Sequence, residues 1–237
     1  MRRKHIVLFL LFLLAFPLTA WTNSKALYQM SEADIDSFLK SIQGKSFLER
    51  VAWISERAKG TPYFLGPLGE GSQSSYDKKP LIDLTRVDCV TFSEQTLAFA
   101  LSKTYKEAFD TLQKIRYKEG KIAIEYRNHY VMADWVPNNH WLATDVTKEV
   151  GGDLAKPLTR TISHKKLFEQ MNYKGLVAKI PDRKVTIQYV PDDKLSSISS
   201  RLKTGDLAIF IQDQEGIFAA HMGILIRDAK GQLVLRN

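Results

Sequence analysis

The sequence predicts an α+β fold in which helices come first and an antiparallel sheet follows. Apolar residues recur at helical spacing in segments 31–60, 90–102 and 105–117. Strand-like segments separated by short turns that end in glycine fill the last third of the chain. Helices kept apart from an antiparallel sheet in this way are typical of the α+β class.

The first twenty residues predict a secretory signal peptide. Residues 2–4 are basic, residues 6–18 form an unbroken apolar run, and Ala20 is a small residue at the expected cleavage position. The apolar run is shorter than the ~20 residues that a spanning helix needs, which favours cleavage over an uncleaved anchor. We therefore expect export to the periplasm or cell envelope, with no stable membrane insertion after cleavage.

The composition is that of a globular protein. The chain has 237 residues, of which 44% are hydrophobic and 25% charged. The formal charge of +8 includes three basic residues of the expected signal peptide, so the mature chain stays mildly basic. Such a charge suits an anionic wall polymer, although a solvated surface without a partner explains it equally well. The sequence lacks a cluster of arginines with interleaved aromatic residues, which is the pattern that would predict nucleic-acid binding.

The helical part begins after the expected signal peptide. Segment 31–60 predicts two helices broken near Gly44, with Ser31 as an N-cap and Gly60 at the end. We expect residues 21–59 to pack on the core as a helical extension of a domain that spans residues 60–237. Prolines and glycines make residues 61–75 a loop.

The middle of the chain predicts a buried helix, an amphipathic helix and then strands. Residues 90–102 are apolar nearly all round, which places that helix in a core. Residues 105–117 predict a second helix with one apolar face. Residues 140–184 show no clear pattern. Strands are expected at 121–127, 129–136, 185–191, 205–211, 218–227 and 232–237.

The chain has one cysteine, Cys89, at the expected start of the buried helix. A single thiol forms no internal disulfide, so an exported protein keeps it either buried and inert or for its chemistry. At the first turn of a helix, the unpaired N–H groups and the dipole lower a thiol pKa towards neutrality. The position therefore predicts a nucleophile.

A nucleophilic cysteine needs a base, and His221 is the candidate. It lies within an apolar strand, where an imidazole without a partner is costly to bury, although a satisfied core histidine remains the simpler alternative. Asn237 falls on the neighbouring strand, where its amide can orient the imidazole. The other histidines are expected elsewhere: His5 in the signal peptide, His129 at the start of a strand that lines a pocket, His140 in a loop, and His164 exposed on a polar helix.

Five motifs occur in an order that resembles the NlpC-type cell-wall cysteine hydrolases, a papain-like superfamily. They are "GTPYFLGPLGEG", "DCVTF", "TGDLAIF", "AHMGILI" and the terminal "LRN". Within that superfamily, "IRYKEGKIAIEYRNHYVMADW" and "DVTKEVGG" resemble the N-acetylmuramoyl-L-alanine amidase-like branch. The similarity extends from about residue 60 to the last residue and implies a papain-like fold, with N-terminal helices packed on a central antiparallel sheet.

The resemblance also implies roles for individual residues. Cys89 would be the nucleophile, His221 the base and Asn237 the orienting residue, although the superfamily commonly has a histidine at the third position. Tyr63 would stand near the thiolate and help to hold the oxyanion. Asp88 would point into the cleft or anchor the loop before the helix.

Residues 129–136 are more polar and aromatic than a plain core strand. In a hydrolase, His129, Tyr130, Asp134 and Trp135 could line a sugar or peptide subsite, with Trp135 stacked on a sugar ring. An edge strand whose aromatic residues pack on the core is an equal alternative.

The resemblance implies an exported amidase that cleaves the N-acetylmuramoyl–L-alanine bond of peptidoglycan or its fragments. A D-Glu–diamino acid endopeptidase would share the same catalytic residues. A cell-wall-binding protein without activity, or a cysteine-dependent acyltransferase, is a further alternative. We expect no cofactor and no metal, because the sequence has no H-E-x-x-H motif and no zinc-type cluster.

Overall fold

The computed structural model describes residues 25–228 and 230–237, so the expected signal peptide, residues 1–20, lies outside the described residues. The α-helices are α1 (Glu32–Ser41), α2 (Phe47–Arg57), α3 (Cys89–Leu101), α4 (Tyr105–Arg116), α5 (Val136–Asn138), α6 (Thr147–Gly151), α7 (His164–Gln170) and α8 (Leu195–Ile198). The strands are β1 (Lys156–Ile162), β2 (Arg183–Tyr189), β3 (Leu207–Ile211), β4 (Ala219–Arg227) and β5 (Leu233–Arg236).

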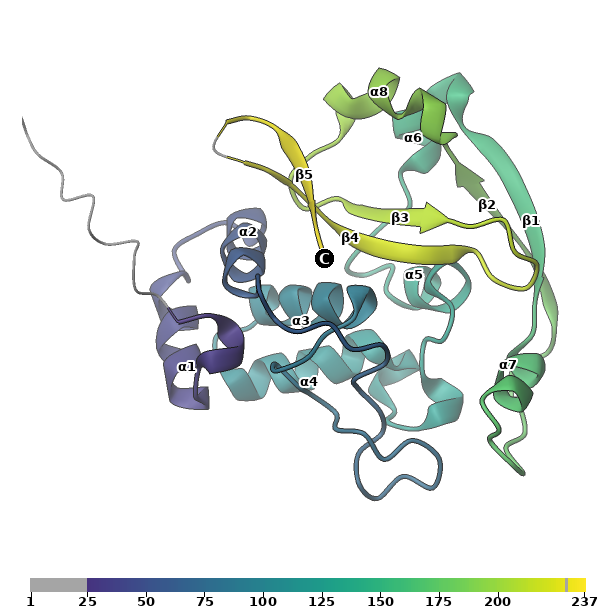
Figure 1. Ribbon diagram of the computed structural model, residues 1–237, viewed down its shortest axis with the longest axis horizontal. Coiled ribbons are helices and arrows are strands. Elements are labelled where there is room, and N and C mark those ends of the chain that lie inside the picture. Colours follow the sequence, from purple (N-terminus) through teal and green to yellow (C-terminus); the bar gives the residue numbers. More distant parts are fainter. Residues whose placement is uncertain (1–24, 229) are drawn as a thin grey trace, which may run out of the picture.

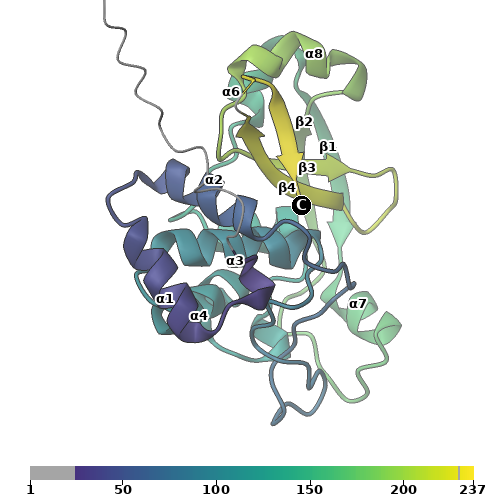
Figure 2. The same cartoon turned by 60° about the vertical axis from the view of Figure 1, so that its left-hand side comes forward.

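Four helices, α1 to α4, gather on one side of the molecule, and the strands lie on the other (Figures 1 and 2). Both predicted helices of segment 31–60 are confirmed, and each begins with a serine N-cap. The Asp34 N–H donates to the Ser31 hydroxyl, and the Glu49 N–H donates to the Ser46 hydroxyl. Such caps satisfy N–H groups that a helix start leaves without a partner.

Helix α3 is the centre of this half. Ten of its residues are buried, and it packs against α2, α4 and β4. Its Phe99 and Ala100 share one hydrophobic core with Ile54 of α2, Leu112 of α4 and Ile224 of β4. The prediction of a buried helix at 90–102 is confirmed, and its all-round apolar pattern follows from partners on every side.

The strands form two separate antiparallel sheets, not the one central sheet that we expected. Strands β3, β4 and β5 form a three-stranded meander in that order, which confirms the prediction for the last third of the chain. Strands β1 and β2 pair as a two-stranded sheet beside it. Strand β1 was not predicted because its sequence, "KPLTRTI", contains proline and polar residues and has no apolar alternation.

The predicted strands at 121–127 and 129–136 are wrong. Residues Ile124–Tyr126 form a 3-10 helix, and residues Val131–Trp135 form a π-helix. The Asp134 carboxylate accepts the Tyr130 N–H at 3.0 Å, and the Trp135 N–H donates to the Tyr130 carbonyl at 3.0 Å. These local bonds satisfy the backbone without a neighbouring strand, and they override the apolar pattern.

Within residues 25–228 and 230–237, no helix is both long enough and apolar enough to cross a bilayer.

A polar cluster of Glu94, Trp135 and Arg116 is enclosed in the core next to α3. Glu94 of α3 accepts the indole N–H of Trp135 at 3.0 Å and lies 3.7 Å from the Nε of Arg116. All three side chains are buried. Burial raises the pKa of Glu94 to about 7, while the charge of Arg116 and the indole donor oppose that shift. Glu94 therefore depends on both partners to remain in the core.

Replacement of Trp135 by Phe removes the indole donor and leaves Glu94 with one partner. We expect a loss of about 1–3 kcal/mol in the free energy of unfolding, measured by urea denaturation. Trp141→Phe changes a partly exposed side chain and is the matched control, with an expected change within about 0.5 kcal/mol. Equal stability of the two variants would contradict a structural role for the indole N–H.

Candidate active site

Cys89 is the first residue of α3, as predicted, and Asp88 is its N-cap. One carboxylate oxygen of Asp88 accepts the N–H of Thr91 and its hydroxyl, both at 2.8 Å. The Asp88 N–H in turn donates to the Thr91 hydroxyl at 2.9 Å. This reciprocal cap fixes where the helix begins, and so it fixes the thiol at the positive end of the helix dipole.

The second carboxylate oxygen of Asp88 binds the loop before the helix. It accepts the N–H of Gly66 at 2.9 Å. Gly66 has a φ of +61°, a conformation that side chains other than glycine rarely adopt. Asp88 is buried and its oxygens are already occupied, so it anchors the loop, which is one of the two roles expected for it.

Tyr63 lies alongside the segment that leads into α3. It forms a parallel bridge with Val87, in which the Val87 N–H donates to the Pro62 carbonyl at 3.0 Å and the Phe64 N–H donates to the Val87 carbonyl at 2.9 Å. The Tyr63 side chain is 66% exposed. Partial burial raises its pKa, and the neighbouring Cys89 and Asp88 raise it further. Tyr63 therefore keeps its hydroxyl proton, and the effect of Cys89 on its pKa places the two groups within electrostatic reach of each other.

The thiol of Cys89 is half-buried, and this burial changes its expected ionisation. Burial raises the thiol pKa above its ordinary value. Backbone hydrogen bonds from Met222, Val90 and Cys89 itself lower the pKa without offsetting the effect of burial. The expectation of a lowered thiol pKa is therefore wrong for the resting protein, because burial and the charge of Asp88 raise the pKa more than the backbone hydrogen bonds lower it.

Strand β4 brings His221 to the same region. Its neighbour Met222 forms the backbone hydrogen bond to the thiol. The His221 ring lies 6.0 Å from the ring of Phe210, its cross-strand partner on β3. Among the described residues, no hydrogen bond joins the thiol directly to the imidazole. Hydrogen bonds between catalytic groups are often long or absent before substrate binds. The lack of a direct bond is therefore compatible with a nucleophile–base pair.

Asn237 follows β5 and contacts His221, as the hairpin prediction required. Its side-chain amide meets Nε2 of the imidazole. With the amide oxygen of Asn237 turned towards Nε2, it accepts the Nε2–H and leaves Nδ1 as the ring nitrogen that can accept a proton. In both views of the fold, the end of the chain lies close to α3 (Figures 1 and 2).

Arg236 fixes this last strand to the helical half. It donates to the Ala52 carbonyl at 2.8 Å and to the Ser55 hydroxyl at 2.9 Å, and it pairs with Glu56 at 2.5 Å. Sequence reasoning missed Arg236 and Gly66 as supports of the site. A charged residue inside a short apolar strand was the available signal for Arg236, whereas the role of Gly66 depends on its backbone N–H alone.

The structure does not bring His129, Tyr130, Asp134 and Trp135 to a cleft. Trp135 is fully buried, so the expectation that it stacks on a sugar ring is wrong.

Asp134 is buried between His164, at 2.9 Å, and Arg183, at 2.6 Å. His129 contacts the Ile124 carbonyl at 2.7 Å, and burial lowers its pKa to about 4. Tyr130 donates its hydroxyl proton to the Ser163 carbonyl at 3.0 Å. These residues hold α7 and β2 to the core, which agrees with the packing alternative.

His164 is buried, and its predicted exposure is wrong. It is the first residue of α7, which confirms the polar helix, but its ring faces Asp134 inside the protein. His140 is exposed in the turn after α5. In the part of the chain that the structure describes, no group of three or more His, Cys, Asp or Glu side chains could hold a metal ion.

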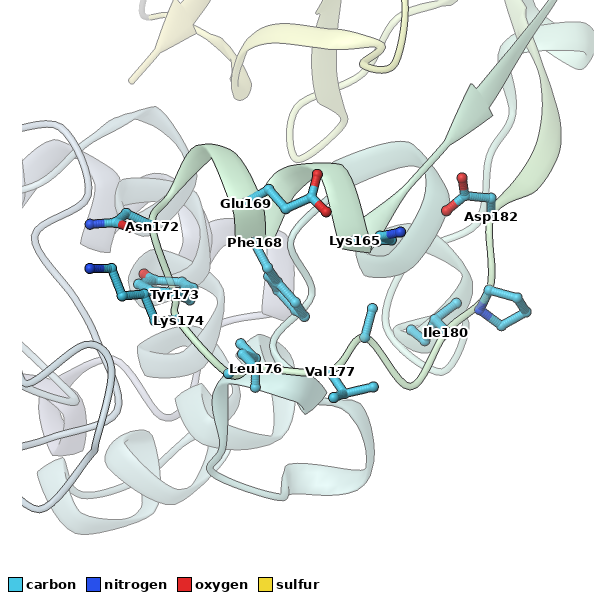
Figure 3. A pocket seen from close by; sticks show the side chains of 13 residues that line it. Lys165, Phe168, Glu169, Asn172, Tyr173, Lys174, Leu176, Val177, Ile180 and Asp182 are labelled. Atoms are coloured by element: carbon cyan, nitrogen blue, oxygen red, sulfur yellow. The ribbon is translucent and has the colours of Figure 1, made fainter.

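A hollow of about 660 Å³ lies between α7 and the segment that leads to β2 (Figure 3). Its wall includes Phe168, Leu176, Val177 and Ile180, and none of Cys89, His221 and Asn237 lines it. Chemistry needs a nucleophile and a base, so the candidate active site is at the start of α3 and not in this hollow.

Comparisons with known proteins identify the family and the fold. A family model described as "AmiA-like: N-acetylmuramoyl-L-alanine amidase-like" matches residues 53–237. A search of curated proteins finds no significant match.

Solved structures share the fold. The Legionella pneumophila protein LPG0564, described with the family model DUF1460, is 22% identical, covers 86% of each chain and superposes with a TM-score of 0.71. A structure described as an N-acetylmuramoyl-L-alanine amidase from Bacteroides uniformis is 25% identical, with a TM-score of 0.63 over 80% of this chain and 84% of that one. A second structure of the same description is 26% identical, with a TM-score of 0.62 over 80% and 83%.

The raised thiol pKa predicts how Cys89 reacts in the resting protein. Because Cys89 is the sole cysteine, the rate of alkylation by iodoacetamide reports on this site alone. We expect the rate to rise with pH and to reach its midpoint above the ~8.5 of an ordinary cysteine. A midpoint below pH 7 would show instead that the thiolate is stable in the resting site.

Proposed function

The chain belongs to the AmiA-like, N-acetylmuramoyl-L-alanine amidase-like family, and from this premise we propose that it is an exported peptidoglycan amidase with Cys89 as its nucleophile. The substrate bond is the amide between the lactyl group of N-acetylmuramic acid and L-alanine. The observation that carries the proposal is the position of Cys89, which stands at a capped helix start beside the strand that bears His221. We also propose that the fold is a variant of the papain-like NlpC type.

In the first step, the sulfur of Cys89 attacks the lactyl carbonyl carbon while the thiol proton passes to Nδ1 of His221. A base is needed here because the buried thiol is protonated at neutral pH. The contact of Asn237 with Nε2 supports this assignment when the amide oxygen faces the ring, because the oxygen then accepts the Nε2–H and Nδ1 carries the lone pair that takes the proton.

The tetrahedral intermediate carries a negative oxygen that needs donors. The Thr91 N–H is used by the cap, whereas backbone hydrogen bonds from Cys89 and Val90 already reach the sulfur. These two N–H groups, with the hydroxyl of Tyr63, are the donors that we assign to the oxyanion. The raised pKa of Tyr63 favours this role because a neutral phenol donates.

The carbon–nitrogen bond then breaks, and His221 gives its proton to the departing L-alanine amine. A thioester of the muramoyl group on Cys89 remains. Water attacks this thioester, His221 accepts the proton of the water, and the thiol is restored as the muramic acid leaves. No electron transfer takes place in either step, and atoms balance with one water consumed.

Location in the cell envelope is part of the proposal. It rests on the basic start and the apolar run of residues 1–20. Such a location would give the enzyme access to the wall or to its released fragments.

The experiment uses protein that starts at residue 21 and defined muropeptides, with products identified by mass spectrometry. We expect free stem peptide that begins with L-alanine, and a loss on the order of 10³-fold or more in rate for Cys89→Ala. A Ser102→Ala variant, which changes a buried hydroxyl at the opposite end of the same helix, is the matched control and should remain active. Cleavage inside the stem would indicate the endopeptidase instead, and no cleavage of any muropeptide would contradict the proposal.

A further inference from the structure

Buried charges clamp one loop, residues 66–80, to the core beside the candidate active site. The Nε of Arg127 donates to a Glu70 oxygen at 2.6 Å, and its Nη2 lies 3.0 Å from an Asp77 oxygen. The Arg127 side chain is 15% exposed, and those of Glu70 and Asp77 are 3% and 7% exposed. One arginine thus joins two carboxylates that lie on opposite sides of the same loop.

Two neighbours from the end of α4 hold the loop at its backbone. The carbonyl oxygen of Gly69 accepts from Arg116 at 3.2 Å and from the Tyr117 hydroxyl at 2.9 Å. Arg116 also lies beside Glu94 of α3. The clamp therefore connects the loop to the helix that begins with Cys89.

Stability alone does not account for these charges. Burial of ionic groups costs desolvation energy, and apolar residues of similar volume often stabilise a fold equally well. Ionic groups differ from apolar ones in that they fix direction and distance, because bidentate contacts of arginine tolerate little displacement.

The segment between the Arg127 contacts and the active site is short. Pro67 and Leu68 are buried, and they connect Gly69 directly to Gly66, whose N–H donates to the carboxylate of Asp88.

We propose that Arg127 is a positioning residue, which acts through Glu70, Asp77 and the loop to hold the Tyr63–Gly66 segment against Asp88 and Cys89. The role in catalysis rests on the proposed function. Arg127 touches no reacting atom. It keeps the Tyr63 hydroxyl at the distance from the thiol where a developing oxyanion needs it, and it keeps the Gly66 N–H on the cap.

The first test is a double-mutant cycle between Arg127→Lys and Tyr63→Phe, read as kcat and KM on the muropeptide substrate. Arg127→Lys retains the charge and loses the planar guanidinium group that contacts Glu70 and Asp77 together. We expect kcat to fall by about 10- to 100-fold with KM nearly unchanged. In the Tyr63→Phe background, Arg127→Lys should lower kcat little further, because the hydroxyl that Arg127 positions is already absent. If the two effects multiply, or if kcat does not fall, the proposal is wrong.

Arg183→Lys is the control for stability. Arg183 also binds a buried carboxylate, that of Asp134, but it lies in the β1–β2 sheet and holds no part of the loop. Its variant should lose stability without a loss of kcat per folded molecule. Asp77→Asn serves as a second loop variant should Arg127→Lys fail to fold, and a fall in its kcat is likewise expected.

The rate at which Cys89 is alkylated tests the positioning role of Arg127 without any substrate. A loosened loop uncovers the half-buried thiol, so iodoacetamide should react several-fold faster in Arg127→Lys than in wild type or Arg183→Lys. Equal rates in all three proteins would overturn the positioning role. If wild type cleaves no muropeptide, the proposed function fails, while these rates still decide whether Arg127 positions the thiol segment.

Discussion

The candidate site depends on one carboxylate, that of Asp88. One of its oxygens caps α3 through Thr91, and the other holds Gly66 of the preceding loop. The cap decides that Cys89 is the first helical residue, and the loop contact decides where the Tyr63 segment lies. A longer or neutral side chain could not satisfy both partners with the same geometry. A single buried group therefore positions both the proposed nucleophile and the segment that carries the proposed oxyanion donor Tyr63.

The proposed general base, His221, is positioned by the strands and not by Asp88. Strand β4 passes the start of α3, and the bond from Met222 to the thiol fixes their register. Strand β5 then carries Asn237 to the imidazole, and Arg236 ties that strand to α2 across the core. The N-terminal helices thus support the site, although none of their residues belongs to it. Burial also raises the pKa of the resting thiol, so the proposed attack needs a base that removes the thiol proton.

Much of this arrangement was predictable from the sequence, and the failures have physical causes. The buried helix, its cysteine and the terminal meander follow from apolar periodicity and glycine turns, which local physics governs. The strand predicted at 129–136 is wrong because the Asp134 carboxylate accepts the Tyr130 N–H and the Asp134 N–H donates to the Tyr130 carbonyl, and these local bonds override the strand pattern. His164 and Trp135 were misplaced because their partners, Asp134 and Glu94, are 30 and 41 residues away. Distant pairings of this kind leave no periodic signal in a single sequence.

If Cys89 is the covalent nucleophile that we propose, the enzyme carries part of its substrate during turnover, and its mass is the direct measurement. The reaction with a muropeptide would be stopped in acid within one turnover, and the peptide that contains Cys89 would then be weighed. The account predicts a muramoyl thioester on that peptide, absent from His221→Ala and removed by hydroxylamine. Release of L-alanyl stem peptide with Cys89 unmodified at every time point would contradict it.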